Sequence, residues 1–306
     1  MSAAKPAMSW QVRVVRGLLR VFAVLPLSVL HRFGGVLSGL ARLVNSREVR
    51  VARRNIALVF PEADGRRQAT MLRATLRETA CGLTELPRIW GVPAARALAL
   101  IEAVSGLEHL QRAQAQGCGV LVAAPHLGQW ELLNLYLCSR SPMALLYRSP
   151  QHAAWEPLLL AARGSLGAQQ IRADAAGVRA LVRCLHQGKL VGILPDQRPK
   201  GGEGAFAAFF GRPCKSMTLL GRLAHKTGAP VVFGFAERLP DGAGFRVHFL
   251  PAPEGIAAAD PEIAVAALHA GIEACVRIAP LQYQWTYKRY SMQPDRTAES
   301  LYPDCR

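Results

Sequence analysis

His126 and Glu131 are the residues whose types and spacing best suit acid–base chemistry. They lie within residues 124–131, Ala-Pro-His-Leu-Gly-Gln-Trp-Glu. An imidazole can accept a proton from a hydroxyl, and a carboxylate beside it can orient the ring and stabilise its charged form. Residues five apart on one helix point about 140° away from each other, so the pair meets only if His126 lies in a loop and Glu131 in the first helical turn. We expect His126 to be a general base oriented by Glu131.

The elements around this pair agree with that placement. The apolar run Val120–Ala124 predicts a buried strand, and a helix is expected to begin at Trp130. The pair would then lie at the carboxyl end of a strand, where open α/β sheets build their sites. Between them, we expect the backbone N–H groups around Gly128 and Gln129 to stabilise an oxyanion.

Two other predicted strands end in polar residues. Met143–Tyr147 is followed by Arg148, and Leu190–Leu194 is followed by Pro195, then Asp196 and Gln197. We expect Arg148, Asp196 and Gln197 to bind substrate or to shape the same rim as His126. Each has an ordinary alternative: Asp196 as a helix cap or loop carboxylate, and Arg148 as a structural partner for some acid.

A glycine-rich segment, residues 201–204, leads to three phenylalanines. The glycines permit a mobile loop, and Phe206, Phe209 and Phe210 offer an apolar wall. We expect these rings to line a channel for an acyl chain. The alternative is a plain hydrophobic anchor for the loop.

The chain beyond residue 117 alternates between strand and helix patterns. This order predicts an α/β fold with a single mixed, mostly parallel sheet flanked by helices. The expected strands are residues 119–124, 143–147, 190–194, 230–236 and 245–250. The expected helices are residues 130–138, 155–166, 177–187, 216–226 and 261–279, and residues 47–90 form a helical zone before them.

The first 60 residues hold ten Lys and Arg against one acid, more than half of the formal net charge of +16. Residues 1–45 also carry interrupted apolar runs, so we expect a basic, apolar membrane-anchoring helix, followed by an α/β domain over residues 46–306. An interfacial or re-entrant helix fits best, a tilted span is the second reading, and a soluble helix packed on the domain is the third. Such a charge suits anionic lipid at a cytoplasmic membrane face; no nucleic-acid-binding motif is present.

Several classes of chemistry lack their motifs. There is no GxSxG nucleophile turn and no phosphate-binding GxxxxGK[ST] loop, and no metal-ligand spacing occurs. The seven cysteines are scattered, which is typical of free core thiols in a reducing compartment. We therefore expect no metal or cofactor, and a nucleophilic hydroxyl that comes from the substrate.

Together these segments resemble the bacterial lipid A late acyltransferases of the lauroyl/myristoyl transferase type. The resemblance spans nearly the whole chain. It rests on residues 53–62, on the HxxxxE segment from His126 to Glu131, and on Tyr147-Arg148 and Leu194–Gln197. Residues 209–213, Phe-Phe-Gly-Arg-Pro, and the terminal segment 280–290 complete it. Pro125 stands where the family usually has Asn, Ser149 follows Arg148 where Pro is usual, and Tyr287-Lys288-Arg289 replaces His-Arg-Arg.

The resemblance implies an enzyme at the cytoplasmic face of the inner membrane. Such an enzyme moves a fatty acyl chain from acyl carrier protein, its co-substrate and partner, to a hydroxyl of a lipid A precursor. Anionic membrane lipid is the other expected partner. A relative acting on ornithine lipid or a glycolipid, a thioester or lipid hydrolase, and a non-catalytic membrane-binding protein are the alternatives.

Overall fold

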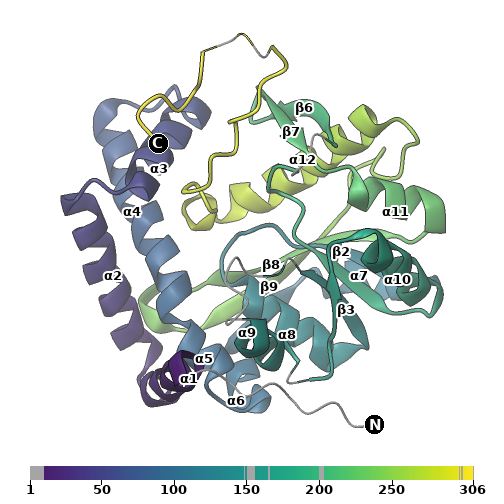
Figure 1. The fold of residues 1–306 in the computed structure, drawn as a ribbon, viewed down its shortest axis with the longest axis horizontal. Coiled ribbons are helices and arrows are strands. Elements are labelled where there is room, and N and C mark those ends of the chain that lie inside the picture. Colours follow the sequence, from purple (N-terminus) through teal and green to yellow (C-terminus); the bar gives the residue numbers. More distant parts are fainter. Residues whose placement is uncertain are drawn as a thin grey trace.

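The fold is built around a seven-stranded sheet with the strand order β1-β9-β8-β2-β5-β3-β4 (Figure 1). The structure is a computed structural model, and it describes residues 10–147, 149, 156–164, 166–199, 203–295, 297 and 299–305. The sheet strands are β1 Ile101–Ser105, β2 Val120–Ala123, β3 Met143–Tyr147, β4 Gln169–Arg172, β5 Leu190–Ile193, β8 Val231–Arg238 and β9 Phe245–Pro251. A separate antiparallel hairpin joins β6 Ala205–Phe209 to β7 Arg212–Ser216.

The sheet is mixed and mostly parallel, as predicted. Only β8 and β9 pair antiparallel; every other neighbouring pair in the seven-stranded sheet is parallel. Strands β2 and β5 are neighbours, with Ala123 opposite Ile193. Because parallel strands end at the same edge, the residues that follow β2 and β5 leave the sheet side by side.

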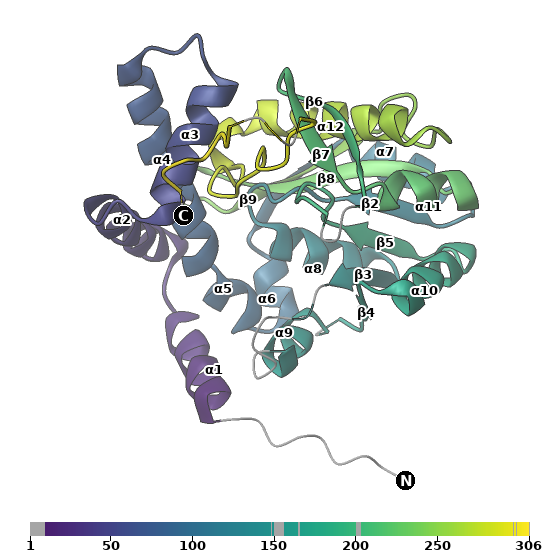
Figure 2. The same cartoon turned by 45° about the horizontal axis from the view of Figure 1, so that its top comes forward.

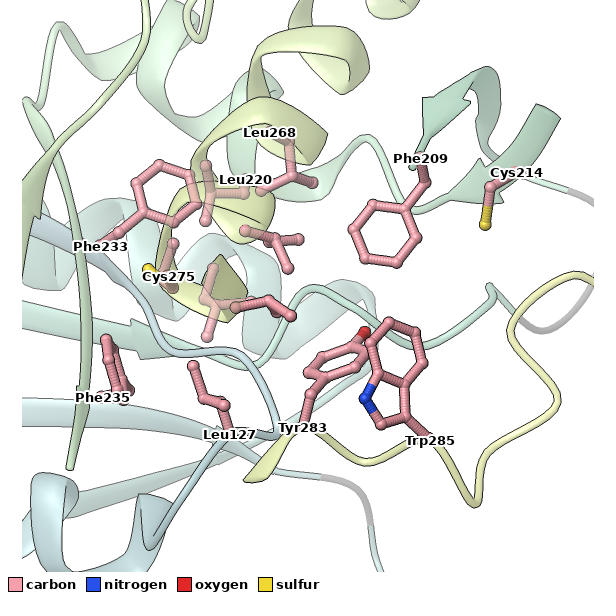
Figure 3. Close-up of a cluster of buried hydrophobic side chains, with 14 of the residues drawn as sticks. Leu127, Phe209, Cys214, Leu220, Phe233, Phe235, Leu268, Cys275, Tyr283 and Trp285 are labelled. Carbon is pink, nitrogen blue, oxygen red and sulfur yellow. The ribbon is translucent and has the colours of Figure 1, made fainter. Parts of the chain in front are cut away.

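Helices cover both faces of the sheet, which explains why β2 is buried along its whole length. Leu121 and Ala123 point into a core formed with α3, α10, α11 and α12, whereas Val120 and Val122 point into a second core formed with α7 and α8. Figure 3 shows part of the first core, where Leu127 lies between Phe235 and Tyr283. These helices are α3 Arg47–Val59, α7 Leu107–Gln114, α8 Trp130–Arg140, α10 Ala175–His186, α11 Leu219–Thr227 and α12 Pro261–Ile278.

The N-terminal part forms two helices rather than the single expected one. They are α1 Trp10–Phe22 and α2 Leu27–Leu43, and Pro26 caps the second in an extended conformation. The break follows from proline, which cannot donate a helical hydrogen bond and disfavours helix at the residue before it. Among the described residues, no helix is long and apolar enough to cross a membrane.

Helix α2 lies against α4, so the N-terminal segment is packed on the rest of the chain (Figures 1 and 2). Its buried face includes Leu27, Leu30 and His31. The remaining helices are α4 Gly65–Thr84, α5 Leu86–Trp90, α6 Ala94–Leu98 and α9 Glu156–Arg163, with short 3-10 turns η2 Pro240–Gly242 and η3 Pro280–Gln282. The helical zone over residues 47–90 is confirmed.

Candidate active site

His126 and Asp196 meet at the edge of the sheet where β2 and β5 end. Nδ1 of His126 lies 2.7 Å from Oδ1 of Asp196, and the backbone N–H of His126 donates to Oδ2 at 2.8 Å. An ionised carboxylate only accepts hydrogen bonds, so Nδ1 carries the proton and Nε2 is left as the acceptor. The sequence placed both residues on one rim, and the structure brings them into direct contact.

Asp196 remains charged in spite of its burial. Its exposed fraction is 2%. Burial by itself raises the pKa of a carboxyl group, but the electrostatic attraction to His126, the hydrogen bonds from His126 and the Arg289 guanidinium together lower the pKa of Asp196 below its ordinary value. A buried, ionised carboxylate holding Nδ1 is the arrangement that orients an imidazole base.

The other ring nitrogen faces an amide. Nε2 of the Gln197 side chain lies 3.3 Å from Nε2 of His126 and donates to Oε1 of Gln284 at 3.2 Å. The Gln284 backbone N–H in turn donates to the His126 carbonyl at 3.0 Å. The C-terminal segment therefore helps to hold the imidazole from the side opposite Asp196.

Glu131 does not contact His126, which corrects the expected pairing. Its carboxylate accepts from Nε of Arg163 at 3.0 and 3.1 Å and forms an ion pair with the second nitrogen of the same fork. Glu131 lies in the first turn of α8 and is buried between α8 and α9, whereas His126 turns toward the end of β5. The spacing of His126 and Glu131 in the sequence permits a contact between them. Because β5 lies next to β2, however, it is Asp196 that reaches His126.

The expected oxyanion role of the Gly128 and Gln129 N–H groups is also wrong for this geometry. The Gly128 N–H donates to the Gln282 carbonyl at 3.2 Å, and the Gln129 N–H donates to the Ala236 carbonyl at 2.8 Å. Gly128 has φ +60°, and a Cβ there would lie 2.0 Å from the Ala236 oxygen. These groups fix the loop against its neighbours, and they are not available to a substrate.

The Gln129 side chain points away from His126 into a buried ionic cluster. Its amide donates to Glu85 at 2.9 Å, and Glu85 pairs with both Arg238 and His31. Burial alone raises the pKa of Glu85, but the Arg238 charge and its hydrogen bonds outweigh burial and lower that pKa. Glu78 pairs with Arg238 at 2.7 Å. Because Arg238 is the last residue of β8, the strand whose Ala236 pairs with Gly128, the cluster ties the His126 loop to α2 and α4.

A cavity of about 740 Å³ opens onto His126. Its wall combines apolar and polar residues: Leu146, Leu159, Leu194, Val178, Met217 and Leu219 are apolar, and Gln197, Arg163, Arg222, Asp174, Glu203 and Thr218 are polar. This is the size and composition of a site for a small or elongated apolar ligand. Within the described residues, no group of His, Cys, Asp and Glu is arranged to hold a metal ion.

The three phenylalanines do not line this cavity. Phe209 is fully buried in the core, where its ring contacts those of Tyr283, Tyr290 and His269 (Figure 3). Phe206 lies under the Lys215 ammonium, and Phe210 packs on Trp285. The cavity thus gives no support to the acyl-channel prediction. Phe209 and Phe210 pack in the way that the alternative, a hydrophobic anchor for the loop, predicts. Arg148 and residues 200–202 lie outside the described residues.

Residues 4–292 match the family of proteins described as bacterial lipid A biosynthesis acyltransferase. The chain belongs to this family. It is 27% identical over 289 residues to the lipid A biosynthesis lauroyltransferase of Escherichia coli (strain K12), covering 94% of this chain and 93% of that protein. It is 29% identical over 282 residues to the palmitoleoyltransferase of the same organism, with coverage of 91% and 90%. A lipid A biosynthesis acyltransferase of Haemophilus influenzae is 25% identical over 277 residues, covering 89% and 86%. The resemblance drawn from the motifs is confirmed, and the protein is an acyltransferase.

Two residues of this lipid A acyltransferase site escaped the sequence reading. Arg163, which pairs with Glu131 and lines the cavity, lies on a predicted helix with no motif to single it out. Gln284 lies in the terminal segment that carries the family resemblance, and only its hydrogen bonds with the His126 carbonyl and the Gln197 side chain show its place at the site. The same segment is held from the N-terminal side by Asn55, which donates to the carbonyls of Trp285 and Tyr287 at 2.6 and 2.8 Å.

Proposed function

We propose that this enzyme transfers a fatty acyl group from acyl carrier protein to a hydroxyl of a lipid A precursor. His126 removes the proton from the acceptor hydroxyl while that oxygen attacks the thioester carbonyl. A new ester bond forms, the thioester bond breaks, and the proton passes from His126 to the departing sulfur. The observation that carries this proposal is the His126–Asp196 pair on the wall of a largely apolar cavity.

The base in this mechanism is Nε2 of His126, because Nδ1 is occupied by Asp196. The Gln197 amide nitrogen lies 3.3 Å from Nε2 of His126 and donates toward it. The hydroxyl of the acceptor substrate must bind at the same position to give up its proton. Gln197 moves aside or shares the nitrogen when the hydroxyl binds. General-base assistance of this kind contributes on the order of 10²–10⁴ in rate.

Arg163 is positioned to stabilise negative charge on the reacting carbonyl. Arg163 lines the cavity, and the two-pronged pairing of its guanidinium with Glu131 restricts the orientation of this side chain. Under this proposal Glu131 acts through Arg163 rather than through His126. A fixed cation in a poorly solvated cavity favours the tetrahedral oxyanion over the neutral thioester.

We also propose that α1 and α2 bind the surface of the inner membrane from the cytoplasmic side. One face of α2 packs on α4, while Val36, Leu40 and Leu43 on its other face are 61%, 55% and 82% exposed. Val24, in the turn between the two helices, is 78% exposed. Arginines flank these apolar positions, as they do in helices that lie in the interface of anionic membranes.

The membrane proposal is tested by flotation with vesicles of phosphatidylethanolamine and phosphatidylglycerol. Leu40→Asp combined with Leu43→Asp should move the protein from the vesicle fraction to the soluble fraction. Leu83→Asp, on the exposed face of α4, is the matched control because Leu83 is 64% exposed. Equal binding by all three proteins contradicts the assignment of this face to the membrane.

The reaction is tested by mass spectrometry of lipid A from a Gram-negative host that lacks its own late acyltransferases. Expression of the chain should add one acyl chain to lipid A, and His126→Ala should abolish the addition. If ornithine lipid, or a glycolipid other than lipid A, gains the acyl chain instead, the acyl-transfer reaction stands and only the acceptor differs. If the thioester of the acyl-loaded carrier protein is hydrolysed at the same rate with and without acceptor, the protein is a hydrolase instead.

A further inference from the structure

A basic groove runs between α10 and α11, which lie side by side in both views (Figures 1 and 2). Arg179 of α10 and Arg222 and Lys226 of α11 line a hollow of about 180 Å³. Its remaining wall is apolar and consists of Val178, Val182, Leu219 and Leu223. A second hollow of about 540 Å³ continues past Arg222 and Lys226 to His225. We call this surface the α10–α11 groove.

The cations of the groove are not neutralised by the protein. Arg179, Arg222 and Lys226 are exposed, and none has an ion-pair partner among the residues that the structure describes. Two nearby acids are engaged at helix starts: Asp174 accepts from the Gly177 N–H and Asp260 from the Glu262 N–H. A cluster of unpaired cations around an apolar floor is suited to a partner with an acidic face and apolar contact residues.

The groove is continuous with the cavity that holds His126. Val178, Leu219 and Arg222 belong to the walls of both. An acyl group attached to a partner in the groove therefore has a direct route to the imidazole. This continuity distinguishes the groove from a basic surface that merely keeps the protein soluble.

We propose that the α10–α11 groove is the docking surface for the acidic acyl carrier protein that delivers the thioester, an inference that rests on the proposed acyl transfer. Arg179 and Lys226 contact acidic side chains of the carrier. Arg222, at the junction with the cavity, lies beside the prosthetic arm that carries the acyl chain. A lipid surface is the less suitable occupant, because the exposed apolar face of α2 lies on the opposite side of the molecule from α10 and α11 (Figure 1).

The test compares two thioester donors with one pair of charge reversals. Arg179→Glu combined with Lys226→Glu changes residues that line the groove but not the catalytic cavity. The matched control is Arg66→Glu combined with Arg96→Glu, two exposed arginines on α4 and α6. Each protein is assayed at low salt with lauroyl-loaded acyl carrier protein and with lauroyl-pantetheine, which lacks the carrier.

We expect the groove variant to raise KM for the loaded carrier by about tenfold or more, with kcat within about twofold. Its rate with lauroyl-pantetheine should match that of the wild type, which also shows that the variant is folded. The control pair should leave both donors within about twofold. Equal KM increases in the two variants, or a loss of activity with both donors, overturn the docking proposal.

Binding is measured separately from turnover, by the fluorescence anisotropy of labelled carrier protein. Wild-type enzyme should bind the carrier, and the groove variant should bind at least about tenfold more weakly. Wild-type enzyme that transfers from neither donor contradicts the proposed function, and the docking proposal is then decided by anisotropy alone. Wild-type enzyme that transfers from both donors but binds the carrier as tightly as the groove variant contradicts only the docking proposal.

Discussion

Asp196 holds His126 at two points, since one carboxylate oxygen lies 2.7 Å from the ring Nδ1 and the other accepts the backbone N–H at 2.8 Å. The side chain thereby fixes the imidazole tautomer and the loop that carries it. The two contacts link the ends of β2 and β5, which are adjacent in the sheet. A residue with this pair of contacts controls both the chemistry and the geometry of the base.

Asp196→Asn should lower kcat by about 10²–10⁴, because an amide no longer stabilises the imidazolium or enforces the Nδ1–H tautomer. Steady-state kinetics with lauroyl-loaded carrier protein measures the effect, and circular dichroism checks the fold. Asp260→Asn is the control, since this carboxylate only caps α12. It should leave kcat within about twofold and change stability little, because Asn caps a helix about as well as Asp. An unchanged kcat in Asp196→Asn contradicts the assigned role.

Glu131→Gln should destabilise the protein by about 2–4 kcal/mol, because it leaves the largely buried Arg163 guanidinium without its carboxylate. The double variant Glu131→Gln/Arg163→Gln should recover part of this loss in a urea-unfolding cycle. If Glu131 acts through Arg163, both single variants and the double variant have similar residual activity. A further drop on adding Glu131→Gln to Arg163→Gln points instead to a direct action on His126.

Gly128→Ala should cost at least about 2 kcal/mol of stability and most of the activity, since its Cβ would lie 2.0 Å from the Ala236 oxygen at φ +60°. Gly117→Ala separates the cost of placing an alanine at positive φ from the cost of the steric clash with a neighbouring atom. Gly117 has φ +75°, but nothing lies within 4 Å of an added Cβ. It should cost only about 1 kcal/mol and leave kcat unchanged. Similar losses in the two variants, measured by urea unfolding and by rate, mean that the close approach has no effect of its own.

His269 makes the free energy of unfolding depend on pH in the acid range. It is fully buried, and burial together with the nearby Arg289 charge lowers its pKa from 6.5 to about 3. Between these two values the unfolded chain binds a proton that the folded chain does not, so stability is present above about pH 6.5 and is lost as the pH falls. By pH 4.5 this loss amounts to roughly 2–3 kcal/mol.

Replacing this histidine separates its contribution from that of the carboxylates. His269→Gln should be less stable than the wild type at pH 7 but should lose roughly 2–3 kcal/mol less between pH 7 and pH 4.5. Urea unfolding at several pH values gives the comparison. Parallel stability curves for the two proteins contradict a buried, neutral His269.

The five inner strands of the sheet were predictable because they are short apolar runs. Residues 143–147 were predicted with the bounds of β3, and β2, β5, β8 and β9 lie within about two residues of theirs. Strand β4 was missed because Gln169 to Arg172 lies at the edge of the sheet and is mostly polar. Strand β1 at the other edge was missed as well. Ser216 was predicted to begin a helix. It is instead the last residue of β7, where it pairs with β6, and the helix begins only at Leu219.

The prediction of the candidate site from the sequence was limited more strongly than the prediction of the strands. Sequence order gave the residues at the strand ends, and His126, Asp196 and Gln197 do converge there. It could not give their pairing, which depends on β5 lying next to β2. Glu131 is five residues from His126 in sequence, but Asp196, 70 residues away, is the carboxylate that reaches it. The spacing of a motif indicates which residues are present at a site, and the strand order decides which of them touch.

The enzyme can become active only after the C-terminal segment that contains Gln282 and Gln284 has been synthesised. Gln284 and Gln282 bind the backbone of the His126 loop, so this loop lacks its support until both have left the ribosome, roughly half the chain later. A nascent chain that has exposed His126 therefore carries an unfinished site and does not hydrolyse or transfer acyl groups during its own synthesis. Chains stalled before residue 280 should show the His126 loop open to proteases, and chains released at full length should protect it.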